Sequence, residues 1–216
     1  MAPGHQDREW ESLQQADRSI RTYFRDLTGL VSQLPYASIT QIVSVFLEAF
    51  VEQRTVYVFG NGGSAASASH LMCDINKGAS ASGDGKRPRV MALTDNTSLI
   101  TAWANDFGYE RIFSEQLKTF IKPRDVAFAI STSGDSPNVL LALETARQSG
   151  AMTVGLGGYQ GGQMKSLCDV CAIVPSDNVQ LVEDLHHAMI HSIFVAVREN
   201  LLHGTTKNLM ARAASF

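Results

Sequence analysis

The chain has 216 residues, of which 44% are hydrophobic and 18% are charged, and its formal net charge is −3. This length suits one well-buried α/β domain with an extra helical element, and we expect no second full domain. The absence of a basic excess argues against nucleic acid or an anionic membrane surface as the main partner. Without a signal-peptide pattern or a long apolar run, the sequence predicts a soluble, cytoplasmic protein.

Two amphipathic helices are predicted before any strand. Apolar residues recur at helical spacing over residues 8–33 and again over 36–52, while residues 1–7 resemble a frayed end. Both helices carry a continuous apolar stripe, which is costly to expose to water. They are therefore expected to pack against other parts of the protein or against other subunits.

Strands and helices then alternate to the end of the chain. The predicted strands cover residues 55–59, 89–93, 125–130, 152–156 and 170–174. The predicted helices cover residues 65–77, 98–105, 110–120, 137–148, 163–167 and 179–202. This alternation predicts a five-stranded parallel sheet with helices on both faces, a three-layer αβα sandwich. The loop 78–86 is more typical of a surface connection than of a lid, and the tail after residue 203 is expected to be partly ordered at best.

Two strand-to-helix turns are rich in glycine and hydroxyl groups. The first is Gly60-Asn61-Gly62-Gly63-Ser64, and the second is Ser131-Thr132-Ser133-Gly134-Asp135-Ser136. Such turns direct backbone N–H groups and a helix dipole towards an anion. Because ligands of parallel sheets bind beyond the carboxyl ends of the strands, where both turns lie, the pair predicts a site for a phosphorylated small molecule.

The second turn is the predicted phosphate site. Its hydroxyl groups belong to Ser131, Thr132, Ser133 and Ser136. The alternative is a helix N-cap, for which Ser136 ahead of Pro137 is sufficient. Since capping accounts for only one of these hydroxyls, phosphate binding is the favoured interpretation.

Two helices carry histidine and acidic residues at a spacing of four. His70 and Asp74 share one helix face, and Glu183, His187 and His191 step along the last helix. Together they predict a mixed metal site or a proton-transfer site, whereas the alternative is an ordinary hydrogen-bonded pair on a solvated face. Eight residues of helix rise about 12 Å, so Glu183 and His191 reach one ion only if the helix is distorted. His187 is then the alternative ligand.

Cysteine usage points to packing rather than to redox chemistry. The chain has Cys73, Cys168 and Cys171, so no even-numbered disulfide framework exists. The C-x-x-C spacing of the last two is compatible with a redox or zinc motif, but no second pair accompanies it. Cys168 and Cys171 are interpreted as small packing residues.

The order of the two turns, with the spaced histidines and acids, resembles the sugar isomerase (SIS) domain family and, within it, the phosphoheptose isomerases. The matching segments also include Ala104-Asn105-Asp106-Phe107-Gly108. The resemblance implies an N-terminal helical segment for oligomerisation (1–54), a sugar-phosphate-binding SIS domain (55–203) and a C-terminal tail (204–216). It also implies a homotetramer with sites at subunit interfaces.

The resemblance implies a role for each matching residue. Asn61, Gly62, Gly63, Asn105 and Asp106 are expected to contact the sugar, and the four hydroxyl residues its phosphate. A zinc ion is expected between His70, Asp74, Glu183 and His191, with Asp74 and His191 exchanging protons with the substrate. The implied reaction is the ketose–aldose isomerisation of sedoheptulose 7-phosphate through an enediol.

The chemical half of the site departs from the family pattern. The family usually has Glu at the position of Asp74 and Gln at that of Glu183. It also tends to have an acid where this chain has Gln180, and an Arg where this chain has Lys77-Gly78. A shorter acid displaces the base by about 1 Å, which can cost on the order of a hundredfold in rate. Isomerisation of a different sugar phosphate is therefore an alternative.

Two further alternatives keep the fold but change the function. One is a protein-binding module resembling the DnaA initiator-associating protein, in which the acid of the His-x-x-x-acid pair is missing. The other is a sugar-phosphate-sensing regulator, which would carry a DNA-binding domain. Retention of His70, Asp74 and His191 favours an enzyme over the binding module, and the regulator is not favoured because no such domain is expected in this sequence.

Overall fold

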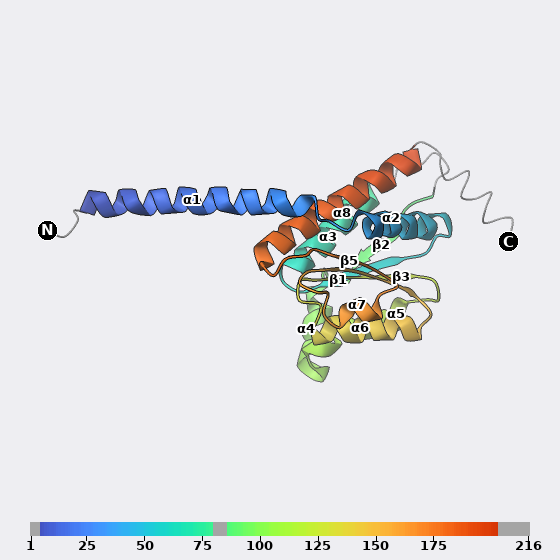
Figure 1. Cartoon of the computed structure of the whole chain (residues 1–216). Coiled ribbons are helices and arrows are strands. Elements are labelled where there is room, and N and C mark those ends of the chain that lie inside the picture. The colour runs from blue at the N-terminus through green and yellow to red at the C-terminus, as the bar shows by residue number, and fades with distance from the viewer. Residues whose placement is uncertain (1–4, 80–85, 203–216) are drawn as a thin grey trace.

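A parallel sheet of five strands forms the centre of the molecule (Figure 1). The structure is a computed structural model that describes residues 5–79 and 86–202. The strand order is β2-β1-β3-β4-β5, and every neighbouring pair is parallel. The strands are β1 (Val56–Gly60), β2 (Val90–Ala92), β3 (Val126–Ser131), β4 (Met152–Gly157) and β5 (Val170–Ile173). The order reverses at β1 and β3, so their carboxyl ends are where a ligand is expected.

Helices cover both faces of the sheet, which confirms the three-layer prediction. Residues of α2 (Tyr36–Val51), α3 (Gly63–Gly78) and α8 (Val179–Leu202) pack on one face. The other face is covered by α4 (Thr97–Phe107), α5 (Ser114–Phe120), α6 (Pro137–Gln148) and α7 (Met164–Leu167) (Figure 1). Because strands β1 and β3 are buried along their whole length, alternate side chains such as Val58 and Phe59 enter opposite apolar clusters.

The first helix, α1 (His5–Val31), extends away from the domain (Figure 1). Its apolar residues Leu13, Ile20 and Phe24 are 59%, 58% and 60% exposed. The Tyr23 hydroxyl links it to the domain by donating a 2.6 Å hydrogen bond to the Asp184 carboxylate of α8. This bond raises the pKa of Tyr23 to about 12. The apolar stripe predicted for this helix packs against the domain at Leu27 and Leu30 and is uncovered further towards the N-terminus in a single chain.

Two sequence-based expectations need correction. The single helix predicted over 110–120 is instead a 3₁₀ turn, η1 (Tyr109–Arg111), followed by α5, because Ile112 and Phe113 between them turn into the core. Residues 5–7, expected to fray, belong to α1. All other predicted elements are present with ends shifted by at most two residues. Residues 80–85 of the predicted loop and the whole predicted tail lie outside the described residues.

Among the described residues, no single helix has the length and apolar character needed to cross a membrane. Residues 12–31 and 36–51 pass that test only as a pair, across a bend of 71°. Six residues of α2 are buried within the domain. This burial accounts for the apolar composition of α2.

Candidate functional site

The second hydroxyl-rich turn surrounds a cavity at the carboxyl end of β3. The cavity has a volume of about 230 Å³ and no Lys or Arg in its lining. It is lined by Asn61, Ser64, Ile130, Ser131, Thr132, Ser133, Ser136, Tyr159, Val179 and Glu183. The structure therefore brings the four predicted phosphate-binding hydroxyl residues together with Asn61 and Glu183.

Two of the hydroxyls also hold the turn in shape. The Gly134 N–H donates to Ser131 Oγ at 3.1 Å, and the Asp135 N–H donates to Ser133 Oγ at 3.2 Å. Gly134 has a φ of +70°, which a residue without a side chain adopts at little cost. Ser136 occupies the N-cap position of α6, but its side chain makes no capping hydrogen bond. The N-cap interpretation therefore does not account for Ser136, whose hydroxyl faces the cavity lining.

The loop after β4 supports this turn from behind. The Met164 N–H donates to the Gly134 carbonyl at 2.9 Å, and the Gln163 N–H donates to Asp135 Oδ1 at 3.0 Å. A side chain at Gly134 would overlap the backbone of Gly161. The turn is thus fixed by contacts that leave its hydroxyl side open to the cavity.

Asn61 connects the two turns. Its amide group exchanges two hydrogen bonds with the amide of Asn138, at 2.9 and 2.8 Å, and its Oδ1 accepts a third from the Tyr109 hydroxyl at 3.1 Å. Asn138 is buried in the first turn of α6, whereas Tyr109 comes from η1. Neither residue was predicted for the site. Asn138 could have been recognised from the sequence, because a polar side chain at the buried start of a helix needs a hydrogen-bond partner. Tyr109 gave no such signal.

Glu183 lies against the start of α3. A side chain at Gly63 would begin only 3.0 Å from both carboxylate oxygens of Glu183, so glycine permits this close approach. Gly62, with a φ of +55°, forms the N-cap of α3. The glycines of the first turn therefore admit a carboxylate into the wall of the cavity. Their direct contact with a sugar stays a prediction.

A cluster of three histidines and one acid lies further along the same pair of helices. His70 Nε2 of α3 lies 2.9 Å from His191 Nε2 of α8, and one of the two nitrogens donates to the other. Asp74 Oδ2 lies 3.3 Å from His70 Nε2 and 3.7 Å from His191 Nε2. The ring of His187 lies 4.6 Å, centroid to centroid, from each of the other two rings. The structure thus brings together His70, Asp74 and His191 as predicted.

The cluster has the donor chemistry of a metal site. His70, His187 and His191 each offer a ligand nitrogen, and these atoms lie within 4.8 Å of one another. Imidazole ligands bind zinc at about 2.0–2.1 Å, so a tetrahedral ion fits this spacing. Glu183 is not part of this group, and His187 takes the place that was predicted for Glu183. Partial burial and the two neighbouring histidines lower the pKa of His187, which favours the neutral form that binds metals.

The cavity and the histidine cluster lie along the same pair of helices. Helices α3 and α8 pack side by side, with Glu183 at Gly63, His191 at His70 and Phe194 at Gly78. Contacts that advance in the same direction on both helices mean that the helices run parallel. Gly63 and His70 are separated by about 10 Å of helix rise. A ligand with its phosphate in the cavity can therefore extend towards the cluster.

Asn105 and Asp106 belong neither to the cavity lining nor to the histidine cluster. They are exposed at the end of α4 and bond to each other, with Asn105 Nδ2 donating to Asp106 Oδ1 at 2.7 Å. They do not line the 230 Å³ cavity. Their contact with the sugar stays a prediction. Ser64, Tyr159 and Val179 line the cavity without having been predicted; only Ser64, at the end of the first turn, carried a recognisable signal.

His186 is a buried histidine behind the site. It is 1% exposed, and its Nε2 donates to the Gly157 carbonyl at the end of β4 at 3.0 Å. Burial lowers its pKa to about 4. The neutral ring of His186 links α8 to the end of β4 through this hydrogen bond. We therefore interpret His186 as a structural residue.

The two cysteines of the C-x-x-C pair are half-buried against β4. Both sulfurs lie close to Gly155, where a side chain would meet them at 2.8 and 3.1 Å. A hydrogen bond between the thiols raises the pKa of Cys168 and lowers that of Cys171. Both residues pack against the apolar cluster that lies between the sheet and α5 to α7, which agrees with the packing interpretation.

Comparisons with known proteins agree with this geometry. A model of the SIS domain matches residues 22–158. A phosphoheptose isomerase from Trichlorobacter lovleyi is 40% identical over 167 residues, which are 76% of this chain and 83% of that protein. A phosphoheptose isomerase from a Geobacter species is 38% identical over 193 residues, 88% of this chain and 97% of its own length.

A solved structure extends the comparison to three dimensions. A phosphoheptose isomerase from Francisella tularensis superimposes with a TM-score of 0.76 at 26% identity, covering 87% of this chain and 98% of that one. Sequence and structure lead to the same family. The chain belongs to the SIS domain family and, within it, to the phosphoheptose isomerases, and it is a sugar-phosphate isomerase.

Proposed function

We propose that the enzyme interconverts sedoheptulose 7-phosphate and D-glycero-D-manno-heptose 7-phosphate. The observation that carries the proposal is the helix pair α3 and α8, which has a hydroxyl-lined cavity at its start and a cluster of titratable side chains about two turns further on. The relatives at about 40% identity support this substrate through their name, phosphoheptose isomerase.

The phosphate end of the substrate is assigned to the turn between β3 and α6. Hydroxyls of Ser131, Thr132, Ser133 and Ser136 face the cavity, and the dipole of α6 provides positive potential at its start. No cationic side chain lines the cavity, so backbone and hydroxyl groups supply the hydrogen bonds. The carboxylate of Glu183 repels a phosphate and accepts hydrogen bonds from sugar hydroxyls. We assign it to the sugar.

The proton transfers are assigned to Asp74 and His191. Isomerisation removes a proton from C1, returns one to C2, and moves a hydroxyl proton from O1 to O2, with no net change in the electron count. Asp74 acts as the base at carbon, and His191 exchanges the hydroxyl proton. Their 3.7 Å separation allows both to reach one enediol.

The imidazoles of His70, His187 and His191 are assigned as the ligands of a divalent metal, with zinc favoured. A bound metal ion supplies Lewis acidity that polarises the substrate carbonyl. A ring nitrogen bound to a metal cannot carry a proton, so His191 exchanges the hydroxyl proton only when its nitrogen is released from the metal, whereas Asp74, next to two of these histidines, remains available to hold a proton throughout. This assignment replaces Glu183 by His187 in the ligand set.

A homotetramer is proposed for the assembly. The exposed apolar stripe of α1, with Leu13, Ile20 and Phe24, supports it, because an isolated helix of this kind is marginal in water. A second copy of the chain offers the same stripe. Charged substitutions at Ile20 and Phe24 are expected to reduce the molar mass measured by light scattering. Cytoplasmic location stays a prediction.

The substrate is tested with ketose phosphates of five, six and seven carbons. Purified protein supplied with zinc is incubated with each, and the aldose product is followed by NMR. We expect the seven-carbon ester to give the highest kcat/KM. Preference for a shorter ester would favour the alternative of a different sugar phosphate, to which Asp74 and Glu183 point. Turnover of none would contradict the proposal.

A further inference from the structure

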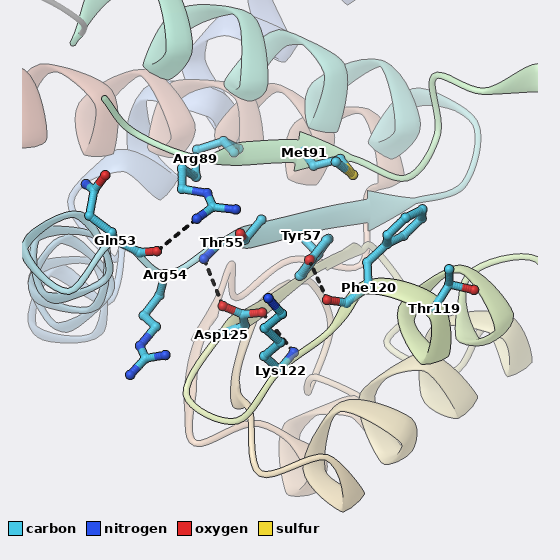
Figure 2. A pocket seen from close by; sticks show the side chains of 11 residues that line it. Gln53, Arg54, Thr55, Tyr57, Arg89, Met91, Thr119, Phe120, Lys122 and Asp125 are labelled. Atoms are coloured by element: carbon cyan, nitrogen blue, oxygen red, sulfur yellow. Dashed lines mark hydrogen bonds between the residues drawn. The ribbon is translucent and has the colours of Figure 1, made fainter. Parts of the chain in front are cut away.

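A second and larger cavity lies at the opposite edge of the sheet, near the amino ends of β1, β2 and β3 (Figure 2). Its volume is about 500 Å³. The lining comprises Gln53, Arg54, Thr55, Tyr57, Arg89, Val90, Met91, Thr119, Phe120, Lys122 and Asp125. None of these residues takes part in the site described above. The cavity is therefore a separate feature of the molecule.

Positive charge dominates this cavity. Arg54, Arg89 and Lys122 face a single acid, Asp125. Arg54 is paired with Glu52 at 3.4 Å, whereas Arg89 and Lys122 form no ion pair within residues 5–79 and 86–202. The Arg89 guanidinium donates to the Gln53 carbonyl at 3.4 Å. Within the described part of the chain, two cations thus lie beside one cavity without an ion pair.

Asp125 carries one negative charge against these two cations, and backbone N–H groups bond to both of its oxygens. The Thr55 N–H donates to Oδ1 at 2.9 Å, and the Lys122 N–H donates to Oδ2 at 2.9 Å. The side chain is 4% exposed. Figure 2 shows the Asp125 carboxylate beside the Lys122 side chain, with dashed lines to backbone N–H groups. Its single charge offsets only part of the charge of Arg89 and Lys122, so the lining keeps a net positive charge that attracts an anion from solution.

An apolar wall accompanies the two cations. Met91 of β2 and Phe120 at the end of α5 are 41% and 43% exposed. The Tyr57 ring is buried beside them, and its hydroxyl donates to the Phe120 carbonyl at 3.1 Å (Figure 2). Ligand sites combine such apolar surfaces with a few polar groups that orient the ligand. A flat ring fits against Met91 and Phe120.

We propose that this cavity binds an aromatic organic phosphate, with the phosphate between Arg89 and Lys122 and the ring against Met91 and Phe120. Arginine binds phosphate through two parallel N–H groups, and lysine adds a point charge. The site lies at the amino ends of the strands, whereas the hydroxyl-lined cavity lies at their carboxyl ends. A ligand bound here therefore does not compete with the sugar phosphate. Binding here is independent of the proposed substrate.

The methionines provide a local test. Met91 lines this cavity, whereas Met164 supports the phosphate turn on the catalytic side. Protein labelled with ¹³C in its methionine methyl groups is titrated with phenyl phosphate, inorganic phosphate and phenol. We expect a saturable shift of the Met91 signal with phenyl phosphate, at a lower midpoint than with either fragment. A shift of Met164 alone would show that the probe binds only at the phosphate turn and would overturn the proposal.

Charge variants make the test specific. Arg89→Gln with Lys122→Gln should raise the Met91 midpoint at least about tenfold, since each charge-assisted hydrogen bond contributes measurably to affinity. The matched control, Lys118→Gln with Arg198→Gln, removes the same charge elsewhere and should leave the midpoint unchanged. Equal midpoints in both variants would overturn the proposal. A changed molar mass of the first variant would instead identify this face as an interface between copies.

The outcome is separable from that of the proposed function. The variant at Arg89 and Lys122 should isomerise sedoheptulose 7-phosphate with a kcat within about twofold of the unchanged protein. Neither residue lines the hydroxyl-lined cavity or belongs to the histidine cluster. If the substrate assignment fails, the Met91 titration is unaffected. If the Met91 titration fails, isomerisation is unaffected.

Discussion

The turn between β3 and α6, which we propose as the phosphate site and call the phosphate turn, and the histidine cluster are built in different ways. The turn is one short segment, and its first hydroxyl residue, Ser131, is 5% exposed and bonded to the backbone of Gly134. The cluster joins His70 and His191, 121 positions apart, with side chains that are 43% and 46% exposed. The proposed phosphate site is thus built on one local segment of backbone, whereas the proposed proton transfer depends on two helices that hold titratable groups together. Changes in the first should alter affinity, and changes in the second should alter rate.

The largest effect is expected for Asp74→Asn. The amide cannot accept the C1 proton, so kcat should fall by about 10²–10⁴-fold, as for loss of a general base. KM for the sugar phosphate should stay within a few-fold, because the phosphate turn is unchanged. Steady-state kinetics measure both constants, with Glu144→Gln on the exposed face of α6 as the matched control. Full activity of Asp74→Asn would show that another group removes the proton.

The converse change is Ser131→Ala with Ser133→Ala. Each hydroxyl is expected to hydrogen-bond a charged phosphate oxygen, and such bonds contribute about 1.5–3 kcal/mol each. Removing both should weaken phosphorylated ligands by roughly a hundredfold or more, with a smaller change in kcat. Calorimetric titration with the phosphorylated and unphosphorylated ketose measures the difference. Ser149→Ala, at the far end of α6, is the control. Unchanged affinity for the ester would remove the turn from the site.

The metal ligands are distinguished by a pair of variants on α8. His187→Ala should lower zinc affinity by at least about ten- to hundredfold, the range seen even for groups that only support a metal ligand. Glu183→Gln should leave zinc affinity unchanged and alter KM, because its carboxylate lies at Gly63 in the cavity wall. Competition with a zinc chelator measures both variants. The reverse pattern would restore Glu183 as the ligand.

The smallest effect concerns the contact between α1 and α8. Asp184 accepts the Tyr23 hydroxyl and raises the pKa of Tyr23 to about 12. The folded pKa lies above the usual value of about 10, so this stabilisation is complete below pH 10 and is lost as pH rises towards 12. Absorbance titration should show that Tyr23→Phe removes one tyrosine from the late phase and that Asp184→Asn moves one towards pH 10, while Tyr57, whose pKa burial also raises, stays late in both variants. Isomerase constants near neutral pH should change less than twofold; a larger change would mean that α1 sets the position of the cluster.

Much of the fold and one lining of the candidate site could be predicted from the sequence. The apolar strands are buried on both faces, so their composition alone indicates a parallel sheet. The order of Ser131, Thr132, Ser133 and Ser136 after such a strand predicts a hydroxyl-rich turn, and these residues line one cavity because the geometry of the turn depends on neighbouring residues. The break at Ile112 and Phe113 was missed, because helical spacing continues through residues that the core pulls out of a helix.

The contacts between segments far apart in the sequence could not be predicted from spacing and are seen in the tertiary structure. Spacing on α8 could not choose between Glu183 and His187, because the choice depends on how α3 lies against α8; the parallel packing places Glu183 at Gly63 and His187 at His70. The bond between Asn61 and Asn138 and the cavity between Arg89 and Lys122 likewise join distant segments. Apart from the break at Ile112 and Phe113, the helices, strands and turns could be predicted from the sequence, since they follow from local backbone preference and from the pattern of apolar residues. Which side chains meet across helices and strands depends on packing of the whole domain, and only the tertiary structure shows it.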